Sequence, residues 1–145
     1  MATYSSEAYT KNLPIAQLGH AGEVKAAFFT VTCAAAPATT DTINFGYMPA
    51  NARLLSAALK SSDMDTNGAP ALALNVGDSG DPDRIFAAST VGQAGTVDRS
   101  VAATGQGYLY TEKTLITGVA STNAATGAAG TLYLTVLYMF DPPRV

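Results

Sequence analysis

The chain has 145 residues, of which 48% are hydrophobic and only 13% charged, so it fits one domain whose surface is neutral through small polar residues or partner subunits. The formal net charge is -3, and the eight Lys and Arg residues are scattered singly along the sequence. Both facts argue against a nucleic-acid partner, because phosphate binding requires clustered positive charge. The single cysteine excludes an intrachain disulfide and a cysteine metal cluster.

Residues 1–23 mix polar and aromatic side chains without a sustained period, which predicts an extended N-terminal arm before a domain at 24–145. The arm lacks the basic start and apolar stretch of a signal peptide, so we expect no export by that route. It either docks on a partner or packs on its own domain as an irregular edge. The residues that would contact a partner are Tyr4, Tyr9, Leu13, Ile15 and Leu18.

From residue 24 the chain divides into short segments rich in β-branched and aromatic residues, separated by Gly, Pro, Asn and Asp clusters. This spacing is typical of an all-β domain. The predicted strands cover residues 24–33, 42–47, 53–61, 71–76, 85–91, 108–111, 114–120 and 132–140. Eight strands are typical of a jelly roll, so we predict an antiparallel, jelly-roll-like β-sandwich.

Two of these segments have a composition that allows a second interpretation. Residues 53–61 contain helix-forming Ala and Leu, but Leu55, Ala57 and Leu59 alternate with more polar positions, which favours a strand. Residues 132–140 are apolar on both faces, so the strand is either central in a sheet or part of a subunit interface. This stretch is far shorter than the roughly 20 residues of a membrane-spanning helix, and we expect no membrane partner. Its candidate contact residues are Tyr133, Leu137 and Met139.

The first of two acidic loops contains Asp63, Asp65 and Asn67, which match the first half of an EF-hand calcium loop. The second half fails, because Leu74 stands where a bidentate Glu is needed and the flanking segments are predicted strands. Asp, Asn and Gly are also the residues that β-turns require. A turn is therefore the favoured interpretation, and a cation site is the alternative.

The second acidic loop contains Asp78, Asp81 and Asp83, followed by Arg84. Paired carboxylates could bind a cation or serve as general acid and base. Acidic residues in solvated loops more often cap turns, and Arg84 could neutralise Asp81 or Asp83. We therefore interpret this loop as a structural turn.

Nucleophilic catalysis would have to use the only histidine and the only cysteine. His20 lies in the arm and Cys33 lies at the end of a predicted strand, with nothing nearby to activate the thiol. The glycine-rich stretches lack the Lys of a phosphate-binding loop. We expect no enzyme activity and no cofactor.

Two stretches, INFGYMPANARLL at 43–55 and NVGDSGDPDRIFAA at 75–88, resemble small virion proteins of tailed phages, in particular capsid decoration or cement proteins. The resemblance implies a β-sandwich on the outer capsid surface, bound to the major capsid protein and self-associated as a homotrimer. It transfers no catalytic or ligand residue. The alternatives are a head-fibre, tail or baseplate component, and a calcium- or carbohydrate-binding adhesion module, which the absence of Trp disfavours.

Overall fold

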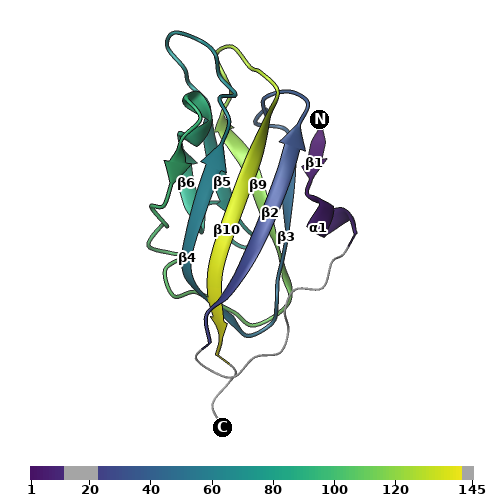
Figure 1. Ribbon diagram of the computed structural model, residues 1–145, viewed down its shortest axis with the longest axis vertical. Helices are drawn as coiled ribbons and strands as arrows, with labels where there is room; N and C mark the ends of the chain where they lie inside the picture. Colours follow the sequence, from purple (N-terminus) through teal and green to yellow (C-terminus); the bar gives the residue numbers. More distant parts are fainter. Residues whose placement is uncertain (12–22, 142–145) are drawn as a thin grey trace.

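A computed structural model describes residues 1–11 and 23–141, which form two β-sheets packed face to face (Figure 1). The sheet that we call the front sheet has the strand order β2 (Lys25–Cys33), β10 (Gly130–Phe140), β4 (Ala52–Ser61) and β7 (Val97–Asp98), with β8 (Leu109–Tyr110) also paired to β4. The back sheet has the order β1 (Thr3–Ser5), β3 (Thr42–Met48), β9 (Thr114–Thr122), β5 (Ala73–Gly77) and β6 (Phe86–Ser89). The predicted all-β sandwich is confirmed.

Each of the eight predicted segments contains a strand, including residues 53–61, which form most of β4. Segment 85–91 holds only the short β6 and then turns into the 3-10 helix η1 (Val91–Gln93). The sequence did not predict β1 or β7, which contain three and two residues. The pairing is antiparallel except between β1 and β3, which run parallel, so the prediction of a purely antiparallel sandwich is corrected at this edge.

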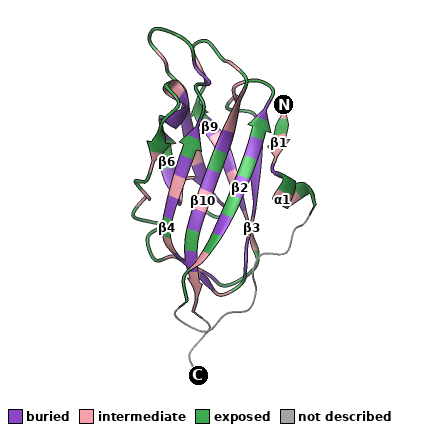
Figure 2. Ribbon diagram, viewed as in Figure 1, coloured by how far each residue is buried: buried purple, intermediate pink, exposed green. Residues whose placement is uncertain are grey.

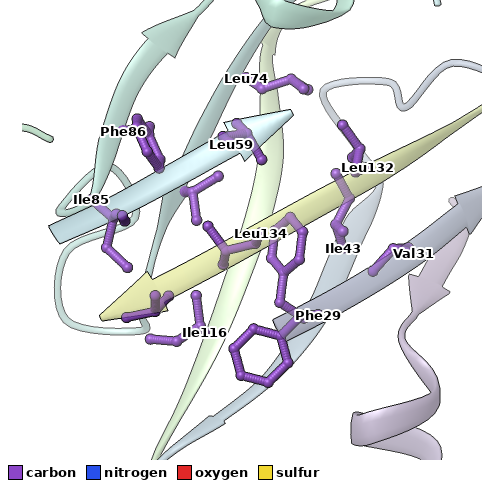
Figure 3. Close-up of a cluster of buried hydrophobic side chains, with 14 of the residues drawn as sticks. Phe29, Val31, Ile43, Leu59, Leu74, Ile85, Phe86, Ile116, Leu132 and Leu134 are labelled. Atoms are coloured by element: carbon purple, nitrogen blue, oxygen red, sulfur yellow. The ribbon is translucent and has the colours of Figure 1, made fainter. Parts of the chain in front are cut away.

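The core lies between the two sheets and follows from alternation along the strands. In β2, Phe29 and Val31 point inward while Phe28 points outward, because successive side chains of a strand face opposite sides. Figure 3 shows Phe29, Leu59 and Leu134 pointing into the space between the sheets. Complete burial of such a side chain contributes roughly 1.5–3 kcal/mol each. The apolar face of every long strand is thereby committed to the core.

Strand β10 is central in the front sheet, because it pairs with β2 along one side and with β4 along the other. A register shift between Leu137 and Tyr138 interrupts its pairing with β4. The first of the two alternatives predicted for this strand, a central position, is therefore confirmed. Its inner face is buried and its outer face is open in the single chain.

The first eleven residues pack on their own domain, as the second of the two predicted alternatives has it. The backbone of β1 pairs with β3, and the short helix α1 (Glu7–Thr10) follows at once. The Ser6 hydroxyl caps this helix by accepting a hydrogen bond from the Tyr9 amide at 3.0 Å, and it donates one to the Phe45 carbonyl. No helix among residues 1–11 and 23–141 is long and apolar enough to cross a membrane.

Candidate functional site

Asp65 joins two loops that lie far apart in the sequence. The residue is 1% exposed. Its carboxylate accepts hydrogen bonds from the backbone amides of Ala71 and Leu72 in one loop, at 2.7 and 3.0 Å. It accepts two more from the amides of Ala125 and Thr126 in the other loop, at 2.9 and 2.8 Å. Burial opposes ionisation of Asp65, but these hydrogen bonds outweigh it and hold its pKa well below the usual range. The carboxylate therefore connects the two loops through hydrogen bonds within the chain.

The other two predicted cation ligands also serve the loop. Asp63 accepts a hydrogen bond from the Asp65 amide at 3.1 Å, and Asn67 accepts one from the Ala69 amide at 2.9 Å. Side-chain acceptors that bond to the next-but-one amide are typical of turns. Among the described residues there is no group of three or more His, Cys, Asp and Glu side chains that could hold a metal ion. The structure supports the turn for this motif.

The second acidic loop is organised around an ion pair that the sequence did not predict. Arg84 donates from Nε to Asp78 Oδ2 at 2.6 Å, while its distance to Asp81 is 3.8 Å. Asp78 also accepts hydrogen bonds from the amides of Gly80 and Asp81, and the Arg84 guanidinium lies 3.7 Å from the centre of the Tyr108 ring. The salt bridge to Asp81 confirms the prediction that Arg84 neutralises Asp81 or Asp83, and Asp78 is a closer partner that was not predicted.

A cavity of about 210 Å³ lies beside this ion pair, lined by Asp78, Arg84, Tyr108 and neighbouring residues of the loop that precedes β9. The Asp78 carboxylate and the Arg84 guanidinium are held by each other, and the carboxylate is also held by two backbone amides. The carboxyl of Asp83 has a raised pKa because Asp81 shares a hydrogen bond with it. This arrangement is suited to fixing the connection between β5 and β6.

The cysteine shows no sign of activation. Cys33 is buried, and burial, together with the negative charge of Asp41, raises the pKa of its thiol to about 11. A thiol with such a pKa remains protonated and unreactive at neutral pH. His20 lies outside the described residues, so the expectation that it does not act with Cys33 in catalysis stays a prediction.

The tyrosines of the arm contact their own domain. Tyr4 is partly buried against the core, and Tyr9 stacks on Tyr47 with 6.0 Å between ring centroids. Leu13, Ile15 and Leu18 lie outside the described residues. A partner contact through this segment stays a prediction.

The surface best suited to a partner is the outward side of β2, β10 and β4, which we call the front face. Phe28 is 73% exposed, Tyr133 is 42% exposed and Leu137 is 36% exposed. Figure 2 shows β2 and β10 alternating between buried and exposed residues along this side. Two of the three predicted contact residues of β10 are therefore exposed, and Met139 is partly buried.

The strand register brings these side chains together. Thr135 lies beside Phe28, and Leu137 follows it on the same side of β10, within reach of the Phe28 ring. On the other flank Tyr133 pairs with Lys60, whose ammonium lies 5.4 Å from the centre of the tyrosine ring. Phe28 was not among the predicted contact residues, although the pair Phe28 and Phe29 in one strand indicates that one phenylalanine faces outward.

The chain is similar to chains in two solved phage capsid structures. No protein-family model and no curated protein matches the chain. A chain in the capsid asymmetric unit of cyanophage Pam1 is 36% identical, with a TM-score of 0.75, and the alignment covers 90% of this chain and 96% of that one. A chain in the capsid of Ralstonia phage GP4 is 32% identical, with a TM-score of 0.85, and the alignment covers 97% of this chain and 99% of that one.

These similarities define the class as a phage structural protein of the virion. The chain belongs to the family of β-sandwich proteins represented in the capsids of cyanophage Pam1 and Ralstonia phage GP4.

Proposed function

We propose that the protein is a capsid decoration, or cement, protein that binds the major capsid protein on the outer surface of the shell, stabilises the shell and has no enzyme activity. The observation that carries this proposal is the near full-length similarity to chains of two phage capsids. The open apolar front face supports it, because exposed apolar patches mark interaction surfaces.

The internal organisation of the domain suits attachment to a shell that has already formed. The two acidic loops are fixed by contacts within the chain, and the core lies between two complete sheets. The domain therefore has a folded form of its own and can dock as a rigid body.

Attachment as a homotrimer is part of the proposal. Three linked copies convert weak single contacts into a strong combined one, because the second and third contacts form at high effective concentration. Sedimentation equilibrium of the purified protein tests this part. A single species with the mass of three chains is expected, and a monomer at every concentration would contradict it.

The function itself is tested with shells that lack the protein. We expect purified protein to bind such shells in many copies per particle, counted by quantitative mass spectrometry, and to raise the temperature at which they release DNA. One or a few copies per particle would contradict decoration and would fit a tail or baseplate position. Binding without any gain in shell stability would contradict the cement role.

A further inference from the structure

We infer that the front face is the docking surface, and that it fits a partner patch on the capsid shell with an apolar centre flanked by carboxylates. This inference rests on the proposed function, since it names the surface and the partner chemistry through which the protein would attach. Three observations carry it: the position of the exposed apolar side chains, the charge of the strands beneath them, and the shape of the face.

The exposed apolar side chains are confined to one sheet. Apart from Met1, the large hydrophobic residues exposed in the described part of the chain lie in the front sheet or immediately before it, and they are Val24, Phe28, Val97, Tyr133 and Leu137. The back sheet, as far as the structure describes it, exposes none. Both sheets bury an apolar face in the same core, so this asymmetry belongs to the outer surfaces and is unrelated to folding.

The three strands of the front face, β2, β4 and β10, have a net charge opposite to that of the whole chain. Strands β2, β4 and β10 contain Lys25, Arg53 and Lys60 and no acidic residue, whereas the chain as a whole has eleven Asp and Glu against eight Lys and Arg. Lys25 is paired with Glu23, and Arg53 with Asp141. Lys60 makes no salt bridge within the described residues and lies over the Tyr133 ring. A partner with carboxylates near Lys60 would be electrostatically complementary.

The same charge argues against a second copy as the occupant. Two front faces packed on each other would bury apolar surface but would place Lys60 of both copies in one contact, where β2, β4 and β10 offer no carboxylate to pair with it. The shell is therefore the partner to which the inference commits. Self-association through this face is the competing result that the experiment must detect.

The shape of the face favours tight docking. Around Phe28 the outward positions hold small side chains, among them Ala26, Thr30 and Thr135, which lose little conformational entropy on burial. Phe28 stands well above these neighbours at 73% exposure. An aromatic side chain surrounded by small ones is suited to fill a pocket of the partner, which is the usual position of a binding hot spot.

The test compares two front-face variants, Phe28→Ser and Lys60→Glu, with Lys113→Glu as the control. Lys113 is a matched control because its ammonium also lies over a tyrosine ring, 4.4 Å from the centre of Tyr47, but on the opposite sheet. Binding to purified shells that lack the protein is measured by co-sedimentation. Phe28→Ser and Lys60→Glu should each weaken binding by about tenfold or more, and Lys113→Glu by less than about twofold.

The dependence of shell binding on salt concentration gives a second test of the charge at Lys60. Raising the ionic strength should weaken wild-type binding and strengthen the residual binding of Lys60→Glu, because screening removes an attraction in the wild type and a repulsion in this variant. Melting temperatures and sedimentation of the free variants show whether each is folded and in which oligomeric state. Wild-type binding with equal binding of both variants would overturn the inference, as would a variant that loses self-association but keeps its shell affinity. Failure of the wild type to bind would instead contradict the proposed function.

Discussion

The junction at Asp65 and the front face differ in what they bury and what they expose. At the junction a charged group is buried and every nearby partner is internal, since four backbone amides from two loops surround one carboxylate. On the front face large apolar groups are exposed and have no covering partner within the described residues. The acidic motifs, which look most like chemistry in the sequence, are held by contacts within the fold, whereas exposed apolar side chains are found on the front face.

The largest effect is expected from Asp65→Ala. The substitution leaves four amides of the two loops without their acceptor, the Leu72 amide in a buried place and the other three in partly buried ones, and unmade hydrogen bonds of this kind are costly. The melting temperature should fall by on the order of 10 °C. Thermal unfolding followed by circular dichroism measures it. A fall of only a degree or two, as expected for Asp63→Ala at the exposed neighbour, would show that the junction contributes little.

A smaller loss is expected from Arg84→Met, which keeps the length of the side chain and removes its charge. Asp78 would then be buried without its cation, and the contact of the guanidinium with Tyr108 would be lost. A fall in melting temperature on the order of 5 °C is expected. Arg99→Met, at an exposed position, is the control, and equal melting temperatures for both variants would rule out a structural role for the ion pair.

Acid should act on the junction in a direction that the pKa of Asp65 fixes. Its pKa in the folded protein is lower than in the unfolded chain, so the stability that it contributes is complete above about pH 4 and is lost as the pH falls toward the folded-state value. The melting temperature of the wild type should therefore decline below about pH 4 more steeply than that of Asp65→Asn. Parallel curves for the two proteins would contradict this assignment.

The smallest effect on stability is expected on the front face. Phe28→Ala should change the melting temperature by only about 1 °C, because the ring is already in water. Phe29→Ala is the control one residue away, where the ring is 4% exposed and its removal should cost about 3–5 kcal/mol. If Phe28→Ala destabilised the protein as strongly as Phe29→Ala, the front face would be part of the fold and not a free surface.

The sequence was sufficient for elements whose signal is local. Alternation of apolar residues along residues 53–61 and 132–140 predicts strands, and the apolar outer positions of the second segment identify Tyr133 and Leu137 as exposed contact candidates. Strand β1 escaped prediction because three residues carry no period, and its partner β3 lies about forty positions further along the chain. Phe28 was not predicted as a contact residue because the residues of its strand were not assigned to an inner and an outer face.

The functions of the acidic residues could not be read from the sequence for a physical reason. The partners of Asp65 include Ala125 and Thr126, which are sixty positions away and meet it only when the two loops fold together. The choice of Asp78 over Asp83 as the partner of Arg84 depends on the backbone of the turn, since Asp78 also accepts from two amides there. Residue types fix what such groups can do, and the fold decides which of them meet.

The most direct test of the account is a cryo-electron microscopy map of a capsid saturated with the protein. Decoration through the front face predicts density for the β-sandwich on the outside of the shell, with the front face turned toward the major capsid protein and the Phe28 ring buried in that contact. Density inside the shell or confined to the tail would contradict the proposed function. Density outside the shell with the front face open to solvent would contradict the docking surface alone.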